Sequence, residues 1–277
     1  LKQSRPPEEI IVVDDGSSED LKQVCRLKKS GLIRFSRFEE NRGPAAARNA
    51  GVDVANSEWI CFLDSDDEWY PGKLERQLEW HARNPEVTAS QVREEWFWNG
   101  EKKKKPAAWE QRGGDLFEVS IERCMIGPSC VMLSRKLWNE LGGFNEFFRV
   151  CEDYELWLRL CSSTNVGLVE GDALVRKNGG HADQLSYLTP AMDRFRIHAL
   201  MEVLRSNRIS DSKRALLTKG VLEKAGILAA GAKRRRNEEW MNGYGALSEE
   251  PWESMSQKER EKWFLWSREQ CLSGGGE

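Results

Sequence analysis

The chain has 277 residues, of which 42 are lysine or arginine and 45 are aspartate or glutamate, and its formal net charge is −3. This length suffices for a large hydrophobic core in one domain with an appendage. The balanced charge is unlike that of proteins that coat nucleic acid, so we expect no nucleic-acid partner. Apolar runs stay far below the ~18 residues of a membrane span, so we expect no integral membrane segment. Seven cysteines without a CxxC pair favour reduced thiols in the cytoplasm over a disulfide scaffold.

Short apolar runs alternate with helical patterns through the first part of the chain. Strands are predicted over residues 10–13, 32–35 and 59–63, and helices over residues 17–29, 44–55 and 72–83. This alternation indicates βαβ units and therefore an α/β fold with an open, mostly parallel sheet. Ligands of such sheets bind beyond the carboxyl ends of the strands, which is where acidic clusters stand in this sequence.

In the remainder of the chain, the predicted secondary structure changes near residue 186 from mixed strands and helices to helices alone. Before it we predict one or two strands over 87–98, an exposed loop over 100–106, a strand over 129–134 and helices over 135–141 and 153–160. After it only helical periodicity is found, over 187–207, 210–233 and 256–271. We expect the glycine run at 274–276 to be a disordered tail. We therefore predict an α/β domain over residues 1–185 and a helical extension over residues 186–277.

The most distinctive polar segment is Asp64-Ser65-Asp66-Asp67, directly after the predicted strand 59–63. Carboxylates two residues apart on a turn can face one divalent cation. Mg²⁺ and Mn²⁺ prefer oxygen ligands and are commonly shared between protein carboxylates and substrate phosphates. His181, in a glycine-bordered loop, is a candidate third metal ligand or phosphate contact. A solvated acidic turn and an unrelated loop histidine are the alternative interpretations.

Three further groups of residues are candidates for binding or catalysis. Asp14 and Asp15 end the strand 10–13 and can accept hydrogen bonds from a nucleobase or ribose, or else only form a turn and a helix cap. Arg42 precedes the predicted helix 44–55 and can reach a base or a phosphate, or else lie at the surface. Glu152 and Asp153 begin a helix, where a carboxylate acts as a general base or only compensates the helix dipole.

These segments, in this order, resemble the family 2 glycosyltransferases of the GT-A fold. The resemblance covers residues 8–185 and rests on VVDDGSSED at 12–20, NRGPAAARNAG at 41–51, ICFLDSDDEW at 60–69, GPSCVMLSRKLWNELGGFNE at 127–146 and CEDYELWLRL at 151–160. It implies a Rossmann-like, mostly parallel open sheet. It also implies that residues 1–185 bind a nucleotide sugar and carry the catalysis, with the helical extension outside the resemblance.

The resemblance also implies roles for the nucleotide-binding residues. Asp15 would bind the nucleobase, with Asp14 supporting the turn, and Arg42 would contact the same base. Asp64 would lie near the ribose and share the metal. The donor would accordingly be a nucleoside-diphosphate sugar.

The reaction implied is a metal-dependent transfer of a sugar to an acceptor hydroxyl, with inversion at the anomeric carbon. Asp66 and Asp64 would hold Mn²⁺ or Mg²⁺, with His181 as the further candidate ligand, and Asp153 would be the catalytic base. The acceptor would be a carbohydrate, a lipid-linked molecule or a protein in polysaccharide biosynthesis. We expect a cytoplasmic location, with which peripheral contact at the inner face of the membrane is compatible. The basic run at 233–236 suits either anionic lipid or a solvated helix end.

The chain departs from the family pattern at its start. Family members begin with a strand in the middle of the sheet, whereas the residues before Ile10 are polar. We therefore expect that this first strand is missing and that the catalytic domain is truncated at its N-terminus. Two alternative functions are a nucleotidyltransferase, which needs a glycine-rich basic loop that this region does not show, and a non-catalytic nucleotide-sugar-binding module.

Overall fold

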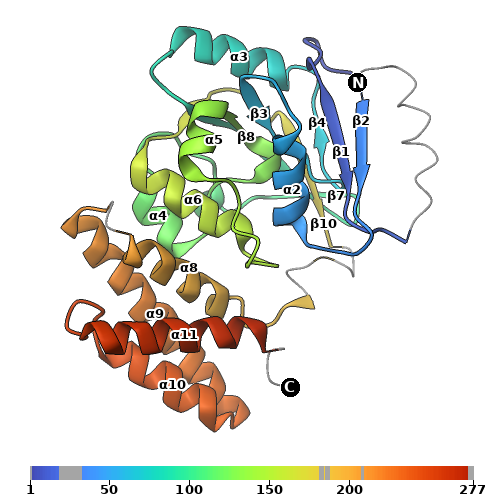
Figure 1. Ribbon diagram of the computed structural model, residues 1–277. Coiled ribbons are helices and arrows are strands. Elements are labelled where there is room, and N and C mark those ends of the chain that lie inside the picture. The colour runs from blue at the N-terminus through green and yellow to red at the C-terminus, as the bar shows by residue number, and fades with distance from the viewer. Residues whose placement is uncertain (1, 19–32, 181–183, 185–187, 207–208, 274–277) are drawn as a thin grey trace. The chain divides into compact units, whose positions relative to one another are not determined.

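The structure is a computed structural model, and it describes residues 2–18, 33–180, 184, 188–206 and 209–273 (Figure 1). The chain forms two compact units. The first comprises Leu1–Leu116, Met125–Leu156 and Asn165–His181, and the second comprises Phe117–Cys124, Trp157–Thr164 and Ala182–Glu277. The second unit thus includes two segments from within residues 1–185, and the predicted division at residue 185 stays a prediction. The predicted helix 17–29 falls almost entirely outside the described residues.

The first unit begins with a two-stranded parallel sheet made of β1 (Ile10–Asp14) and β2 (Ile33–Arg37). β-Branched residues fill β1, which is the composition expected of a strand. Helix α2 (Pro44–Asp53) follows, with Pro44 in its first turn and Gly43 at its N-cap with a φ of 90°. Its small residues lie close to β1, since a side chain at Gly51 would be 3.6 Å from Val13.

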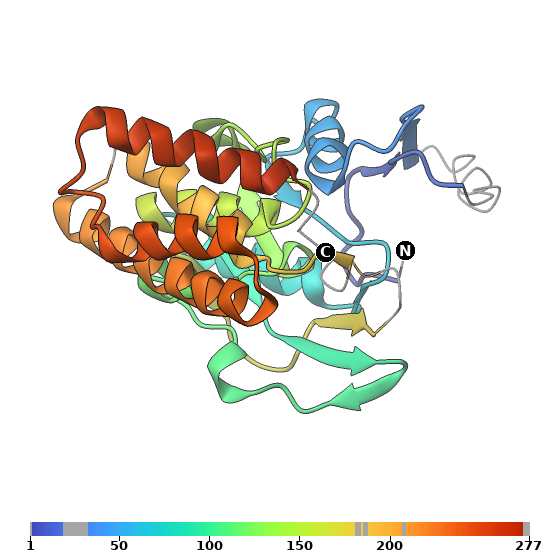
Figure 2. The ribbon, with the colours of Figure 1, turned by 90° about the horizontal axis from the view of Figure 1, so that it is seen from below.

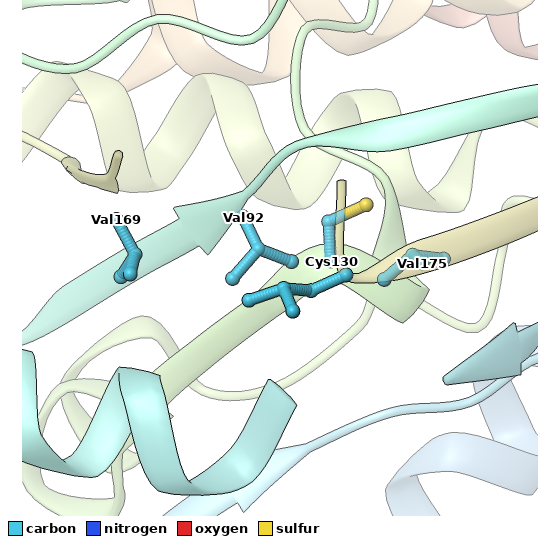
Figure 3. Close-up of a cluster of buried hydrophobic side chains, with 5 residues drawn as sticks. Val92, Cys130, Val169 and Val175 are labelled. Atoms are coloured by element: carbon cyan, nitrogen blue, oxygen red, sulfur yellow. The ribbon is translucent and has the colours of Figure 1, made fainter. Parts of the chain in front are cut away.

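The central sheet of this unit has the strand order β3 (Trp59–Cys61), β8 (Val131–Ser134), β5 (Ala89–Val92) and β9 (Gly167–Val169). Every residue of β5 and β8 is buried, so these strands form the middle of the core. One part of that core consists of Val92, Cys130, Val169, Leu174 and Val175, most of which Figure 3 shows. Helices α3 (Lys73–Arg83) and α5 (Arg135–Leu141) pack against this sheet. Ser134 caps α5 by accepting a hydrogen bond from the Leu137 N–H at 3.2 Å.

A second four-stranded sheet has the order β4 (Glu68–Trp69), β10 (Val175–Gly179), β6 (Glu94–Trp98) and β7 (Glu101–Lys103). Strands β6 and β7 form a hairpin, drawn in teal in Figure 2, around Asn99 and Gly100, whose φ angles are 48° and 82°. Positive φ at both positions is typical of a tight two-residue hairpin turn. The prediction of an exposed loop over 100–106 is therefore wrong at β7, because the Asn-Gly turn sends the chain back along β6.

The directions of the strands are mixed, whereas the sequence predicts a mostly parallel sheet. The pairs β1–β2, β10–β6 and β5–β9 are parallel, and the pairs β10–β4, β3–β8, β5–β8 and β6–β7 are antiparallel. The antiparallel pairs arise because β8 enters between β3 and β5 against both, and because β7 returns through a hairpin. The prediction of an α/β fold followed by a helical part is confirmed.

Helix α6 (Glu152–Ser163) opens with an acidic first turn and contributes its first residues, 152–156, to the first unit. The described residues of the second unit form helices and connecting turns, with no strand among them. It contains α4 (Phe117–Glu122), α8 (Asp193–Arg205), α9 (Asp211–Arg235), α10 (Glu238–Glu249) and α11 (Gln257–Leu272). Helix α11 starts with a reciprocal capping box between Ser256 and Glu259. The sequence predicted α8, α9 and α11 but not α10. None of the described helices is long and apolar enough to cross a membrane.

Candidate active site

The acidic turn after β3 is held in place by hydrogen bonds from two other segments. The buried Asp67 carboxylate accepts a hydrogen bond from the Ser129 hydroxyl at 2.7 Å and another from the Asn178 N–H at 3.1 Å. The side chain of Asn178, on β10, donates to the carbonyl of Asp66 at 2.7 Å. The Asp66 residue itself is exposed. The turn is thus anchored by Asp67, which leaves Asp66 at the surface.

The electrostatic setting of Asp67 differs from that of an ordinary surface carboxylate. Burial raises the pKa of Asp67 to about 6, and the neighbouring charges of Asp66 and Asp64 add to this rise. The Lys177 ammonium and the Ser129 hydroxyl oppose it. A carboxylate that exchanges a proton near pH 6 lies directly beside the two candidate metal ligands.

Arg48, on α2, joins the acidic turn to the start of α6. Its guanidinium donates to Asp64 Oδ1 at 2.7 Å and to Glu152 Oε1 at 2.6 Å, and its side chain is only 15% exposed. Burial lowers the pKa of Arg48, but the charges of the two carboxylates outweigh it and raise this pKa above its usual value. Charge-assisted bonds of this kind are short and strong. The three side chains form a partly buried bridge, which we call the Arg48 bridge.

Sequence reasoning did not single out Arg48. The available signal was its position on α2, three residues after Ala45 and four before Val52, both of which are buried. An arginine on the buried face of a helix needs acidic partners. Which acids these are depends on contacts between distant parts of the chain.

The two acidic residues at the start of α6 have different surroundings. Glu152 is buried, and burial together with the Asp153 charge raises its pKa although Arg48 opposes the rise. The carboxylate of Asp153 accepts a hydrogen bond from the Tyr154 N–H at 2.7 Å and is only partly buried. Through Glu152, the Arg48 bridge brings this end of α6 to the carboxylate of Asp64. Asp153 therefore follows directly on Glu152, which is linked to the acidic turn through the guanidinium of Arg48.

Asp15 connects the end of β1 to the start of α2. Its two carboxylate oxygens accept hydrogen bonds from the N–H groups of Arg42, at 2.6 Å, and Gly43, at 2.8 Å. Gly16 adopts a φ of +70°, and a side chain there would lie 2.9 Å from the backbone of Asn41. These contacts fix the turn after β1 against the segment that precedes α2. Each oxygen keeps a second lone pair, so hydrogen bonds from a ligand are compatible with them.

Asp14 is buried and forms its hydrogen bond within the turn that follows β1. It accepts a hydrogen bond from the Ser17 N–H at 3.0 Å, and Arg37 Nε lies 3.1 Å from its other oxygen. Burial raises the pKa of Asp14, but the hydrogen bonds from Ser17 and the charge of Arg37 prevail and lower it. Asp14 therefore stays ionised and stabilises its own turn.

Arg42 is exposed at the start of α2. Its guanidinium lies 3.1 Å from the carboxylate of Glu146 and 4.7 Å from the centre of the Phe38 ring. Its side chain is 55% exposed, so part of the guanidinium remains accessible to a ligand. This arrangement suits stacking or hydrogen bonding with a planar base.

The candidate metal ligands form a sparse set. Within the described parts of the chain, no group of three or more histidine, cysteine, aspartate or glutamate side chains could hold a metal ion. His181, the third candidate ligand, lies outside the described residues. Asp64 and Asp66 offer carboxylate oxygens alone, which fits a Mg²⁺ or Mn²⁺ ion that takes its other ligands from water and a diphosphate.

The fold defines the class of protein. The crystal structure of Staphylococcus aureus TarS residues 1–349 with UDP-GlcNAc matches 98% of this chain and 75% of that chain, with a TM-score of 0.68 and 17% sequence identity. The chain therefore has the GT-A glycosyltransferase fold, as the sequence predicted. The sequence model described as Glycosyl transferase family 2 matches residues 1–142. The chain belongs to this family.

Several bacterial proteins are similar to the chain in sequence. An uncharacterized glycosyltransferase of Rickettsia felis is 33% identical over 62% of this chain, and the match spans 28% of that protein. The succinoglycan biosynthesis protein ExoU of Rhizobium meliloti is 32% identical over 54% of the chain and 48% of its own length. The Escherichia coli glucosyltransferase WfgD, named for transfer from UDP-Glc to GlcNAc-diphosphoundecaprenol, is 30% identical over 61% of the chain and 64% of its own length. The chain thus spans less than two thirds of each relative.

Proposed function

We propose that this glycosyltransferase moves a sugar from a nucleoside-diphosphate donor to an acceptor hydroxyl, with inversion and with Mn²⁺ or Mg²⁺ as cofactor. The observation that carries the proposal is the Arg48 bridge, because it brings the acidic turn and the start of α6 to one place. UDP and UDP-GlcNAc are bound in structures of TarS, and UDP-Glc is the named donor of WfgD. These names make UDP-sugars the first donors to test.

The residues have distinct tasks in this proposal. Asp15 and Arg42 bind the nucleobase, and Asp64 lies at the ribose and, with Asp66, holds the cation. A bound divalent cation neutralises the charge that develops on the departing diphosphate. Lys177 adds a positive charge beside the same carboxylates, because its pKa is raised by Glu94, Asp67 and Asp64 although burial opposes the rise.

Asp153 is the proposed general base. Its carboxylate takes the proton from the acceptor hydroxyl as the acceptor oxygen forms its bond to the anomeric carbon. The bond from that carbon to the diphosphate oxygen breaks on the opposite face, so the configuration inverts. Glu152 acts differently, since its side chain is buried and binds Arg48. It positions the start of α6 and does not touch the acceptor.

The acceptor and the location of the protein in the cell are also proposals. We propose a carbohydrate, lipid-linked or protein acceptor in polysaccharide biosynthesis, supported by the names of ExoU and WfgD. We further propose a cytoplasmic location with contact to the inner face of the membrane, supported by the lipid-linked acceptor in the name of WfgD.

The test uses Asp153→Asn, which keeps the size and polarity of the side chain but removes its basicity. Release of UDP from UDP-glucose and UDP-GlcNAc is measured with and without Mn²⁺. We expect the wild-type rate to require the cation and the variant rate to fall ~10²–10⁴-fold, the usual share of a general base. The thermal shift caused by UDP with Mn²⁺ should persist in the variant, because Asp153 is not a nucleotide contact.

Glu140→Gln provides the matched control, because Glu140 is an exposed carboxylate on α5 whose Lys136 partner is 4.0 Å away. It should leave both the rate and the thermal shift unchanged. Turnover by Asp153→Asn at the wild-type rate would remove Asp153 from the role of base. If the wild-type protein binds UDP but cleaves none of the UDP-sugars, it is instead a non-catalytic binding module.

A further inference from the structure

A buried arginine lies at the start of helix α8, in the second unit. Arg194 is 4% exposed, and its Nε and Nη1 atoms have no hydrogen-bond partner within the part of the chain that the structure describes. The carboxylate of the preceding residue, Asp193, is engaged by Arg196 at 3.0 Å and by Lys224 at 3.8 Å. Buried charges in proteins are almost always paired, because an unpaired charge loses its hydration without compensation. Arg194 is therefore a buried cation in need of a counter-charge.

Aromatic rings surround the guanidinium of Arg194. Its central carbon, Cζ, lies 4.8 Å from the centre of the Phe195 ring and 5.6 Å from that of Trp240, on α10. Such cation–π contacts favour a positive charge at this place, but they supply no full negative charge. The indole N–H of Trp240 is already engaged, since it donates to Gln270 of α11 at 2.8 Å. The rings thus enclose the guanidinium and leave two of its nitrogens unsatisfied.

A second unsatisfied group belongs to the same region. Tyr244, four residues after Trp240 on α10, is 0% exposed, and its hydroxyl also has no hydrogen-bond partner among the described residues. Its ring packs edge-on against Trp240 and Trp266, with ring centres 5.7 Å and 4.8 Å apart. Burial raises the pKa of Tyr244 and the charge of Arg194 opposes the rise, so the two side chains interact electrostatically. Unsatisfied N–H groups and an unsatisfied hydroxyl therefore lie in one buried region.

The other groups that act on Arg194 are uncharged at neutral pH. Cys271, on α11, has its Sγ 3.7 Å from the carbonyl oxygen of Arg194, and burial raises the pKa of its thiol to about 12 although Arg194 opposes the rise. Burial lowers the pKa of Arg194 itself, and the groups that oppose this are Cys271 and Tyr244. Glu239, which also acts on Tyr244, is exposed and accepts a hydrogen bond from Gln270 at 3.3 Å. We call Arg194, Trp240, Tyr244 and Cys271 the Arg194 cluster.

We propose that the Arg194 cluster binds a small, singly charged anion of the size of chloride or formate. The anion accepts hydrogen bonds from the guanidinium of Arg194 and from the hydroxyl of Tyr244. A single charge follows from the single guanidinium, and a small size follows from the enclosure of both side chains. The anion would join three helices of the second unit (Figure 1), because these residues come from α8, α10 and α11. This site does not depend on the proposed transfer reaction.

The first test observes the anion directly in the folded, full-length chain. The ³⁵Cl resonance of chloride broadens when chloride exchanges with a protein site. We expect wild-type protein to broaden this resonance and formate to reverse the broadening in competition. Phosphate at the same ionic strength should leave the broadening in place, because it is larger and carries more charge. Arg194→Met, which keeps a long side chain against the rings but removes the charge, should lose the broadening.

The second test measures stability, because an anion that binds only the folded chain raises the midpoint of thermal unfolding as its concentration rises. Sodium chloride is varied at constant ionic strength, with bulky gluconate as the replacing anion. We expect the midpoint of the wild type to rise with chloride and that of Arg194→Met to stay constant. Tyr244→Phe keeps the ring contacts and should need about tenfold more chloride for the same rise, the weight of one hydrogen bond to a charged group.

Arg234→Met provides the matched control, because Arg234 is an exposed arginine in the basic run at the end of α9. It should keep the chloride dependence of the wild type. An equal dependence in Arg194→Met would reveal a general effect of salt and overturn the site, and so would a wild-type chain that does not broaden the ³⁵Cl resonance. If Arg194→Met does not fold, an unchanged chloride requirement in Tyr244→Phe overturns the site instead. Phosphate that displaces chloride better than formate does would contradict a small, singly charged ligand.

Discussion

Arg48 carries one positive charge between two carboxylates, and its surroundings determine what its loss would cost. Its side chain is 15% exposed and that of Glu152 is 8% exposed, so neither charge is well hydrated. Removing one member of a buried charge pair is costly mainly because the remaining charge stays buried without a partner. The Arg48 bridge is therefore a point at which a single substitution affects both the stability of the unit and the geometry of the site.

We predict that Arg48→Met lowers the free energy of unfolding by about 3 kcal/mol, toward the lower end of the range for broken buried pairs because Asp64 is 27% exposed. Urea unfolding followed by tryptophan fluorescence measures this change. Arg83→Met is the matched control, since Arg83 is 71% exposed and lies 3.8 Å from Glu79. Its effect should stay below about 0.5 kcal/mol. Equal effects of the two substitutions would contradict the importance of the bridge.

Single residues at strand ends were predictable, but their partners were not. The acidic turn was found because four polar residues follow directly on a short apolar strand. Arg48 was missed because its bond to Glu152 joins residues that are 104 positions apart in the sequence. Spacing along the chain contains no information about such a pair until the fold is known.

At the scale of elements, helix α9 contains two glycines with opposite surroundings. A side chain at Gly220 would come within 2.3 Å of Ile121 on α4, whereas one at Gly226 would meet Ser248 of α10 at an ordinary 3.9 Å. Glycine in the middle of a helix costs roughly 0.5–1 kcal/mol relative to alanine. Substitution by alanine at Gly220 would therefore improve helix propensity but crowd Ile121. At Gly226 the same substitution would improve helix propensity without crowding a neighbour.

We predict that Gly226→Ala raises the free energy of unfolding by about 0.5–1 kcal/mol through helix propensity. Gly220→Ala should lower it by about 1–3 kcal/mol, because overpacking against α4 outweighs the gain in propensity. Thermal and urea unfolding of the two variants provide the comparison. If Gly220→Ala also stabilises the protein, the close approach of α9 and α4 is not a constraint in solution.

The elements that sequence reasoning missed owe their conformation to neighbours. Strand β10 reads Val-Arg-Lys-Asn-Gly and has no alternation of apolar and polar residues, yet it pairs with β6 and β4. Helix α10 includes Gly243 and Gly245, which argue against a helix. It forms because Trp240, Tyr244 and Leu247, spaced for one helical face, are all buried. That spacing was the available signal.

At the scale of the whole molecule, two buried histidines make stability depend on pH. Burial lowers the pKa of His81 and of His198 to about 4, against 6.5 for an unperturbed histidine. The charges of Arg268 and Arg205 also lower the pKa of His198, while Glu202 lies 3.7 Å from its ring and Ser267 hydrogen-bonds to it. Both rings are thus neutral in the folded chain at pH values where the unfolded chain is protonated.

The sign of the effect follows from proton binding. Between pH 6.5 and about 4 the unfolded state binds more protons at these two positions, so acid favours unfolding. The stability from each neutral ring is complete above pH 6.5 and declines as the pH falls toward 4, by up to about 3 kcal/mol. We predict that His198→Gln weakens the decline seen in urea unfolding across this window. His81→Gln should do the same independently, and a decline unchanged in both variants would contradict the assignment.

The Arg48 bridge also has an evolutionary consequence. Its three members come from α2, from the turn after β3 and from the start of α6, so mutations in three separate stretches of the gene act on one charge balance. A lineage that loses the arginine leaves two carboxylates beside each other, and a lineage that loses Glu152 leaves Arg48 with Asp64 alone. We therefore expect these three positions to covary among homologues, with an uncharged residue at position 48 accompanied by an uncharged residue at position 152.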